Sequence, residues 1–238
     1  MAQIDKPNTQ FNTVLYTGNG GTNSVTSLDF QPNFVWIKNR SHAGYNHALF
    51  DSVRSATKVL KSNSTDIERT LTDSLTAFNS NGFSLGADAD GTYGNTVNQN
   101  AKTYASWNWK AGGTASSNTD GSITSSVSAN TTSGFSIVSF TGTGANATVG
   151  HGLGVAPKWI IVKSRGVENW RVYSSYLGAT KAMALNGNNA EDTDSSYWNN
   201  VEPTSSLFTV GTNAGTNGSS VNMIAYCFAD VKGFSKMG

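Results

Sequence analysis

The sequence predicts an all-β fold of two tandem antiparallel β-sandwich domains, of the jelly-roll or lectin-like kind, produced by an internal duplication. Three observations predict it. Long motifs recur at a nearly constant offset, short β-branched and aromatic runs alternate with turn signals, and small polar residues are abundant. The 238 residues include 30 Ser, 27 Thr and 26 Asn, with 37% hydrophobic and 11% aromatic residues. That hydrophobic share is enough for a core, so the polar residues predict a hydroxyl- and amide-rich surface rather than disorder.

The two halves of the chain share motifs in the same order, with matching residues offset by 119 to 125 positions. The matches join residues 11–20 with 135–144, 28–40 with 153–165, 82–86 with 207–211, and 107–109 with 226–228. So many ordered matches predict a repeated structural unit. We expect a first domain at 1–112 with a short N-terminal arm, a linker at 113–120, and a second domain at 121–238.

Strands are expected where short β-branched and aromatic runs are bounded by Gly, Pro or Asn. The runs are residues 13–17, 34–38, 135–140, 159–163 and 221–229. Six Asn-Gly or Asp-Gly pairs, which tolerate positive φ, predict tight turns between strands. Turn signals this frequent are typical of antiparallel sandwiches and jelly rolls.

One segment has a different period. In residues 65–78, Ile67, Leu71 and Leu75 lie at i, i+4 and i+8, which predicts a short helix or a turn within a loop. Residues 189–203 of the second half keep no such period.

Composition excludes several function classes. Charged residues make up 13% of the chain and the net charge is +1, which excludes an electrostatic nucleic-acid binder. Cys227 is the single cysteine, so neither an intrachain disulfide nor a zinc site built from thiolates is expected. No apolar run is long enough to span a bilayer, and residues 1–7 do not form a signal peptide, so we expect no membrane insertion.

Two motifs fit a ligand but fit local structure better. The Gly cluster at 142–154 resembles a phosphate cradle, yet a β-like run follows it where such a cradle needs a helix, so turns are favoured. His42 and His47 lie in one polar loop with no thiol nearby, and the second half has no matching histidine, so loop residues rather than metal ligands are expected.

Acidic residues suggest two further chemistries. Glu68 and Glu191 match between the halves, with Asp192 and Asp194 beside the second, and paired carboxylates would suit glycoside cleavage. Solvated loop acids are the favoured alternative. A second acidic turn supplies the candidate calcium ligands Asp88 and Asp90.

Basic residues recur as matched pairs at the ends of two predicted strands. The pairs Lys38/Arg40 and Lys163/Arg165 are expected to serve the fold by pairing with acids. The expected acids are Asp51 or Glu68 in the first half and Glu191 in the second.

The residues chosen as a contact site are aromatics in polar surroundings. Trp170, Tyr173, Tyr197 and Trp198, with Asn199, suit sugar binding because pyranose faces stack on rings while amides bond hydroxyls. The alternative is that these rings pack against their own sandwich or a neighbouring subunit. No residue is assigned a catalytic role, no bound metal is predicted, and no cofactor is expected.

Several motifs together resemble a known family. They are MAQIDKP at 1–7, FNTVLYTGNG at 11–20, SNTDGSITSSVSAN at 117–130, GFSIVSFTGTG at 134–144, VGHGLG at 149–154 and IAYCFA at 224–229. They resemble a repeated, functionally uncharacterised domain of marine bacteriophage virion proteins, in which it belongs to tail fibres or other structural proteins. The resemblance implies a virion location, after assembly in the host cytoplasm, and supplies no catalytic residues.

The residues and the resemblance together leave three functions open. The first is a tail fibre or fibre-like adhesin, not an enzyme, that contacts host surface polysaccharide. Its partners would be other virion proteins and further copies of the chain, a homotrimer being the usual fibre arrangement. The second is a purely structural role, as a capsid decoration or fibre shaft. The third is a polysaccharide-degrading tailspike, which needs two carboxylates about 5 to 10 Å apart in a groove.

Overall fold

The computed structural model describes residues 4–89 and 96–237 and is nearly all β, with 41% of residues in strands and 5% in helices. All of the ladders between named strands are antiparallel, which confirms the predicted all-β antiparallel fold. Within the described ranges no helix combines the length and apolarity needed to cross a membrane.

The chain divides into two units, which are described separately. The N-terminal unit comprises residues 6–64 and 68–110, and the C-terminal unit comprises residues 111–237 together with 4–5 and 65–67. Part of the segment expected as a linker, 113–120, is strand β10 (Ser116–Asn118), which pairs with β11 (Ser125–Asn130) of the C-terminal unit. Polar composition suggested a flexible tether here, but Ser and Asn also suit an edge strand whose backbone bonds to a neighbour.

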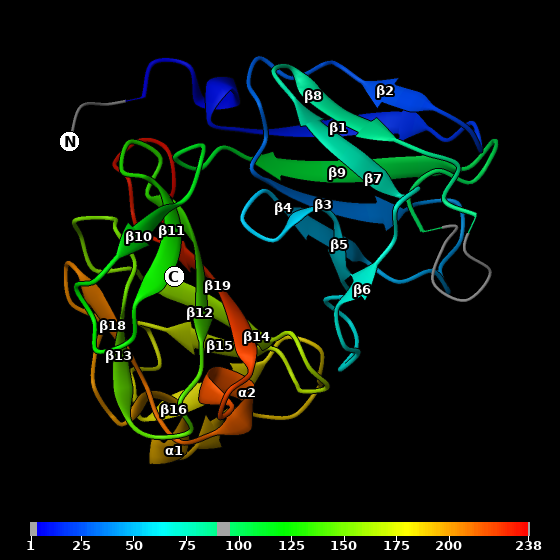
Figure 1. Cartoon of the computed structure of the whole chain (residues 1–238). Helices are drawn as coiled ribbons and strands as arrows, with labels where there is room; N and C mark the ends of the chain where they lie inside the picture. The colour runs from blue at the N-terminus through cyan, green and yellow to red at the C-terminus, as the bar shows by residue number, and fades with distance from the viewer. Residues whose placement is uncertain (1–3, 90–95, 238) are drawn as a thin grey trace. The chain divides into compact units, whose positions relative to one another are not determined.

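The N-terminal unit contains two sheets that enclose one core (Figure 1). The larger sheet contains, in spatial order, β1 (Phe11–Thr17), β9 (Thr103–Trp109), β3 (Phe34–Asn39), β4 (Ala48–Asp51), β5 (Ser55–Leu60) and β6 (Arg69–Thr70). The smaller sheet contains β2 (Asn23–Val25), β8 (Gly82–Leu85) and β7 (Leu75–Asn79). A short 3₁₀ turn, η1 (Pro7–Thr9), precedes β1.

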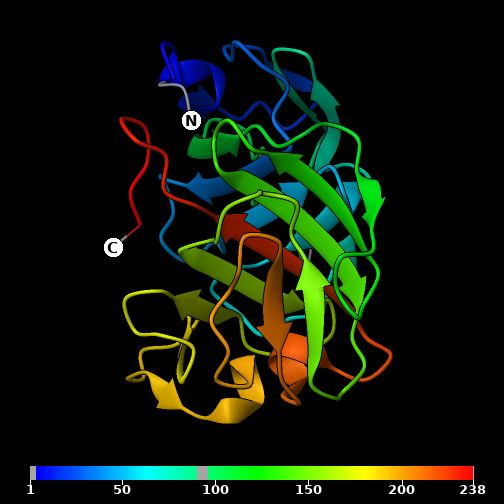
Figure 2. The same cartoon turned by 90° about the vertical axis from the view of Figure 1, so that its left-hand side faces the viewer.

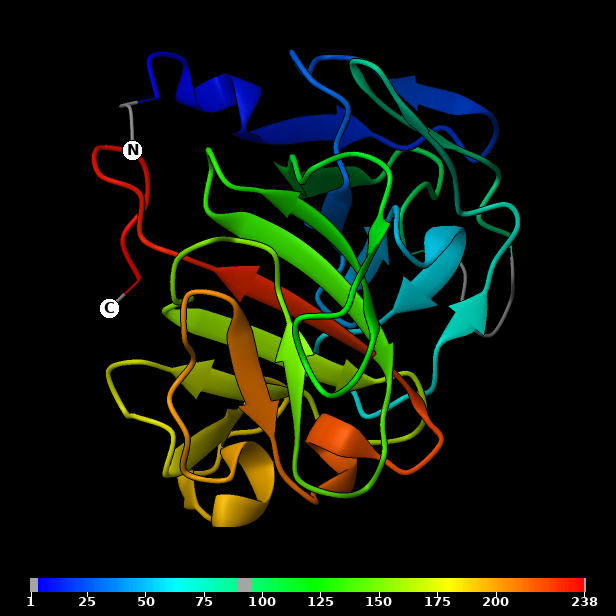
Figure 3. The same cartoon turned by 60° about the vertical axis from the view of Figure 1, so that its left-hand side comes forward.

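The C-terminal unit has a larger sheet of eight strands. In spatial order they are β10, β11, β12 (Phe135–Thr141), β19 (Asn222–Phe228), β14 (Trp159–Ser164), β15 (Arg171–Ser174), β16 (Lys181–Ala184) and β17 (Asp192–Thr193). Figures 2 and 3 show β13 (Ala147–Gly150) and β18 (Leu207–Val210) side by side in front of this sheet. Two single-turn helices, α1 (Ser195–Trp198) and α2 (Ala214–Asn217), complete the unit.

The two units share a strand order. The order β1-β9-β3-β4-β5-β6 corresponds to β12-β19-β14-β15-β16-β17. The register corresponds as well, because Trp109 lies between Phe11 and Phe34 just as Phe228 lies between Phe135 and Trp159. This agreement supports the sequence matches, and the duplication itself stays a prediction. Among the described residues, two further strands, β10 and β11, extend the larger sheet of the C-terminal unit beyond this common order.

Alternation along the strands builds a separate core in each unit. The burial of β9 alternates residue by residue, which turns Tyr104 and Ser106 to one side of the sheet. The N-terminal core includes Phe50 and Phe83, and the C-terminal core includes Trp198 and Phe208. All five predicted strand runs coincide with strands, namely β1, β3, β12, β14 and β19.

The helix expectation for residues 65–78 is wrong. This segment contains β6 and most of β7, and Leu71 and Leu75 are buried in the core from these positions. Helix α1 forms instead within 189–203, which keeps no helical period, and there the Asp194 carboxylate accepts a hydrogen bond from the Ser196 N–H. Pairing with neighbouring strands outweighs the local helical period in the first case, and a side-chain cap supports one turn in the second.

Candidate functional site

The aromatic residues predicted to form a contact face are buried. The exposed fractions are 0% for Trp170, 2% for Tyr173, 5% for Tyr197 and 1% for Trp198. Rings this deeply buried cannot stack on a sugar at the surface, so the prediction of a glycan-binding aromatic face is wrong. The alternative, that the rings pack within their own fold, describes Tyr173, Tyr197 and Trp198, which belong to the C-terminal core.

The polar atoms of Trp198 and Tyr173 have structural partners. The Trp198 indole N–H donates to the Lys181 carbonyl (3.1 Å), and the Tyr173 hydroxyl donates to the Glu202 carboxylate. Burial, followed by that carboxylate, raises the pKa of Tyr173 far above its usual value. Trp170 stacks on Tyr226, with ring centroids 6.4 Å apart. These contacts hold the rings in place and leave no free face for a ligand.

Tyr197 and Asn199 complete the same structural cluster. The Tyr197 hydroxyl donates to the Asp192 carboxylate (3.0 Å), and the Arg171 guanidinium lies 4.5 Å from the centre of the Tyr197 ring. Asn199 ends α1 in the left-handed conformation (φ 52°), and its side-chain oxygen accepts a hydrogen bond from Asn146 (2.9 Å). The exposed ring in this unit is Tyr176, which is 84% exposed in the turn between β15 and β16.

A polar groove lies on the larger sheet of the C-terminal unit, where β10, β11, β12 and β19 lie side by side. Its volume is about 330 Å³. The lining residues are Ser117, Thr124, Ser125, Ser126, Ser139, Phe140, Thr141 and Asn222.

Strand register explains why hydroxyls gather in this groove. Ser117 pairs with Ser126, and Ser126 pairs with Ser139, so three serines form one row across three adjacent strands. Such opposed side chains lie about 5 Å apart. Two residues further along β12, the Thr141 hydroxyl donates to the Asn222 side-chain oxygen (3.2 Å), and both residues are exposed. The groove therefore offers hydroxyl and amide groups, which both donate and accept hydrogen bonds, on an uncharged surface.

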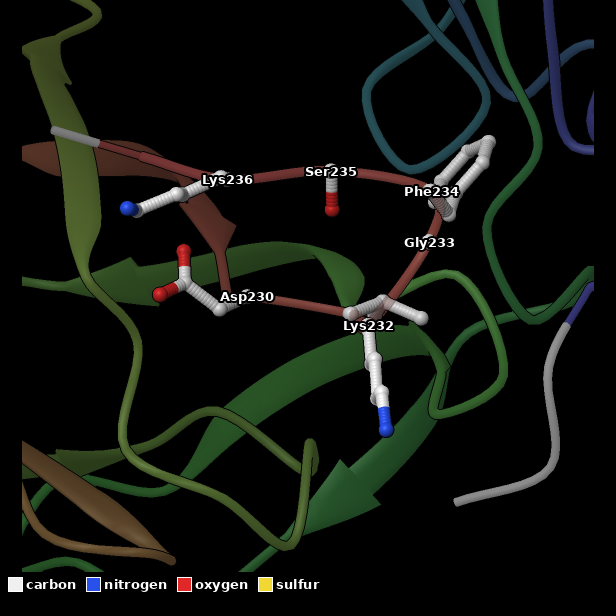
Figure 4. A pocket seen from close by; sticks show the side chains of 7 residues that line it. Asp230, Lys232, Gly233, Phe234, Ser235 and Lys236 are labelled. Carbon is white, nitrogen blue, oxygen red and sulfur yellow. The ribbon is translucent and has the colours of Figure 1, made fainter.

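A larger hollow, of about 700 Å³, is enclosed by a single loop, residues 230–236 (Figure 4). The loop is closed on itself by mutual hydrogen bonds between the main chains of Val231 and Ser235 (3.0 Å each), while the Asp230 carboxylate accepts from the Met237 N–H (2.7 Å). Figure 4 shows that consecutive residues of this loop supply the lining. Because no second element contributes, the hollow has the character of a loop opening rather than a built site.

The calcium candidates do not form a site in the described residues. Asp88 is buried and its carboxylate accepts hydrogen bonds from the Ser74 hydroxyl and from the main-chain N–H of Val97 (2.8 Å) and Asn98 (3.3 Å). These donors occupy the oxygens that a cation would need, and burial raises the pKa of Asp88. Asp90 lies outside the described residues. Within 4–89 and 96–237 no three acidic, histidine or cysteine side chains gather as a metal site would require.

The acids matched between the halves form ion pairs. Glu68 contacts Arg54 (3.0 Å), Glu191 contacts Lys181 (2.7 Å), and Asp192 contacts Arg171 (3.0 Å). The hydrogen bond from Lys181 lowers the pKa of Glu191. Asp194 caps α1, as described above. A polysaccharide-degrading tailspike, the third function, needs two carboxylates in a groove. None of the residues that line this groove is acidic, so the groove does not supply them.

The matched lysines support loops rather than pairing with the expected acids. The Lys38 ammonium donates to the carbonyls of Asn39 (3.0 Å) and Tyr45 (2.9 Å), and the Lys163 ammonium donates to those of Ser164 (2.6 Å) and Gly166 (2.7 Å). Burial lowers the pKa of Lys163 to about 8. Asp51, expected as a partner of Lys38 or Arg40, instead contacts Arg54 (2.5 Å).

The histidines also serve the fold. His47 accepts a hydrogen bond at Nδ1 from the Trp36 indole (2.8 Å), and His42 stacks on Tyr45. His151 is buried, its Nδ1 accepts from the Leu153 N–H (3.2 Å), and burial lowers its pKa.

The glycine motifs form turns, as predicted. Gly144, Gly152 and Gly154 have φ of +71°, +70° and +73°, in the left-handed region that favours glycine. No helix follows this cluster directly, so a phosphate cradle is not formed.

Two buried asparagines, which the sequence analysis did not single out as site residues, organise these turns. In the N-terminal unit the Asn98 amide donates to the carbonyls of Gly21 (2.7 Å) and Gly86 (2.6 Å). In the C-terminal unit the Asn217 amide donates to those of Ala145 (2.6 Å) and Gly211 (2.9 Å). The recurrence of the glycine motif was visible in the sequence, but the asparagines that bind the two turns were not marked by any local pattern.

The chain matches a known protein family. A family model described as a domain of unknown function, DUF7483, matches residues 6–238. No curated protein and no solved structure matches the chain.

Proposed function

Because the chain belongs to the DUF7483 family, whose function is unknown, we propose a function from its surface: a non-catalytic virion structural protein of the tail-fibre type. In this proposal the C-terminal unit contacts host surface polysaccharide through the groove lined by Ser117, Ser126, Ser139 and Asn222. The two units derive from a duplication, and several copies act together in the particle.

The observation that carries the proposal is the row of hydroxyls across β10, β11 and β12. Sugars present many hydroxyls and few charges, so an uncharged surface that both donates and accepts hydrogen bonds suits them. A net charge of +1 and 13% charged residues agree with a ligand recognised by polar contacts. The resemblance to virion domains supports the location, and display in many copies would raise the avidity of individually weak contacts.

The test is an array of bacterial capsular polysaccharides and lipopolysaccharide O-antigens, probed with the full chain. We expect at least one polysaccharide to bind. The double variant Ser126→Ala, Ser139→Ala should weaken that binding about 30-fold, because two hydrogen bonds of about 1 kcal/mol each are lost. Tyr176→Ala is the matched control, since Tyr176 is exposed in the same unit and is not among the groove's lining residues.

Three results would count against the proposal. If the double serine variant still binds the polysaccharide, the groove is not the contact surface. If Tyr176→Ala abolishes binding, the contact surface lies at the exposed Tyr176 ring instead. No binding to any polysaccharide would favour the second function, a purely structural virion component.

A further inference from the structure

Strand β1 ends the larger sheet of the N-terminal unit and has one open side. Its seven residues, Phe11–Thr17, are all uncharged, and Leu15 is 65% exposed. The other strands that end the two larger sheets, β6, β10 and β17, have two or three residues each. Natural sheets usually protect their edges with short strands, charges or proline, and β1 has none of these.

The hydrogen bonds between β1 and β9 show which main-chain groups of β1 face its open side. The Lys110 N–H donates to the Gln10 carbonyl and the Gly18 N–H donates to the Lys102 carbonyl (2.8 Å each). Because antiparallel bonds alternate, the even-numbered residues of β1 bond to β9 and the odd-numbered residues point outward.

Only some of the outward main-chain N–H and carbonyl groups of β1 have hydrogen-bond partners. The Thr13 N–H bonds the neighbouring Asn12 side chain (2.9 Å), and the Thr17 carbonyl accepts from Asn23 (3.1 Å). In the described part of the chain, no loop or side chain reaches the main chain of Leu15. The edge therefore retains main-chain donors and acceptors for another strand.

In the C-terminal unit, the strand that corresponds to β1 has its outer side paired with another strand. β12 occupies the position of β1 in the shared strand order, and β11 pairs antiparallel with its outer side. Ser126 lies opposite Ser139, and Ser128 lies opposite Ile137. The N-terminal unit has no equivalent of β11 among its described strands. The same sheet position thus accepts an uncharged antiparallel strand in one unit and lacks it in the other.

The sequence of β1 is compatible with pairing to itself. In an antiparallel pair centred on Val14, Thr13 lies opposite the second copy's Leu15, and Phe11 lies opposite the second copy's Thr17. All four residues are odd-numbered, so their outward backbone groups meet in register, and no like charges oppose each other. A pair of this kind is isologous, which is the commonest symmetry among oligomers.

We propose that β1 is a docking edge that pairs with β1 of a second copy of this chain, joining the larger sheets of two N-terminal units. This surface is separate from the groove and does not depend on the proposed sugar contact. One ladder buries a small area, so the pair should be weak in dilute solution and strengthened wherever copies are held together.

Sedimentation equilibrium of the full chain, at protein concentrations from about 1 to about 500 µM, tests the proposal, because this range detects even a weak dimer. We expect a monomer–dimer equilibrium. Leu15→Lys should weaken dimerisation at least about tenfold, because it places a charge on the edge opposite an uncharged residue. Adding Thr13→Glu to Leu15→Lys sets the introduced carboxylate of one copy opposite the introduced ammonium of the other and should restore dimerisation to within about threefold.

A second variant tests the backbone contribution. Thr13→Pro removes an outward N–H and keeps the ladder to β9, and it should abolish the dimer while the unfolding midpoint stays near that of the wild type. A chain that stays monomeric throughout the range overturns the proposal. A dimer that Leu15→Lys leaves unchanged, or that the double variant does not restore, also overturns it.

Discussion

At the scale of single residues, two buried asparagines hold the turns of the two units together. Asn98 and Asn217 are each 0% exposed, and the carbonyl of each accepts from a glycine N–H, from Gly20 (2.8 Å) and Gly144 (2.9 Å) respectively. Each amide group also joins two loops that are far apart in sequence. An amide side chain supplies two donors and one acceptor in a fixed plane, so no other uncharged side chain of this size reproduces the set.

Replacing either asparagine should be costly. Asn217→Ala and Asn98→Ala each remove two hydrogen bonds to carbonyls that are mostly part-buried, each bond worth about 1 kcal/mol, so we expect the free energy of unfolding to fall by about 2 kcal/mol or more. Urea denaturation followed by tryptophan fluorescence measures it. Asn146→Ala is the control, because Asn146 is exposed, makes one side-chain bond, and should change stability by less than about 0.5 kcal/mol. Equal effects of Asn217→Ala and Asn146→Ala would contradict this account.

At this scale the sequence predicted residue types better than residue surroundings. Trp170 and Trp198 were correctly marked as aromatics in polar segments, but polar neighbours in sequence did not keep them at the surface. Trp198 packs into the C-terminal core, and Trp170 stacks on Tyr226. The serines of the groove were not singled out, since Ser117, Ser126 and Ser139 become neighbours only through strand register. Register depends on long-range pairing, which local composition does not encode.

At the scale of the element, the repeated Thr-Gly-x-Gly motif explains how the first strand of each shared sheet ends. A Cβ on Gly18 would lie 2.4 Å from the Gln99 carbonyl oxygen, and one on Gly142 would lie 2.3 Å from that of Gly218. The strand end thus approaches the backbone next to the buried asparagine so closely that only glycine fits. The second glycine of each motif, Gly20 or Gly144, supplies the positive φ of the turn.

Alanine at these strand ends should destabilise each unit. Gly18→Ala and Gly142→Ala force backbone to move, and we expect each to lower the free energy of unfolding by about 2 kcal/mol or more. Gly21→Ala is a matched control, because its Cβ would meet only the Asn19 side-chain oxygen at 3.9 Å, an ordinary contact. Thermal unfolding by circular dichroism compares the three. A Gly142→Ala protein as stable as Gly21→Ala would show that the strand end can shift without cost.

The strands were predicted correctly and the helix was not, and the difference lies in whether local sequence preference agrees with the pairing of strands. The five strand runs combine β-branched residues, aromatics and bounding turns, so local preference agrees with the sheet they join. In residues 65–78 the spacing of Ile67, Leu71 and Leu75 suggested a helix, while Thr and Ser between them have low helix propensity. Pairing of β5 with β6 and of β7 with β8 then decided the outcome.

For the molecule as a whole, low charge is the property that links fold and proposed function. The internal ion pairs are short-range and local, such as Arg54 with Asp51 and Glu68. The chain as a whole instead carries many hydroxyl and amide groups, with 30 Ser, 27 Thr and 26 Asn against 31 charged residues. Recognition by such a surface depends on shape and hydrogen bonds rather than on long-range attraction.

Salt dependence separates these two modes of recognition in the intact chain. With a net charge of +1 and a groove whose lining residues are all uncharged, the affinity for the polysaccharide that binds best on the array should change less than about twofold between about 0.05 and 0.5 M NaCl. Surface plasmon resonance with that polysaccharide immobilised measures it. Heparin and duplex DNA serve as controls, because any binding to them would be electrostatic and would fall steeply over the same range. A tenfold or greater loss of polysaccharide affinity would contradict the groove as the contact surface and point to lysine and arginine side chains elsewhere on the molecule.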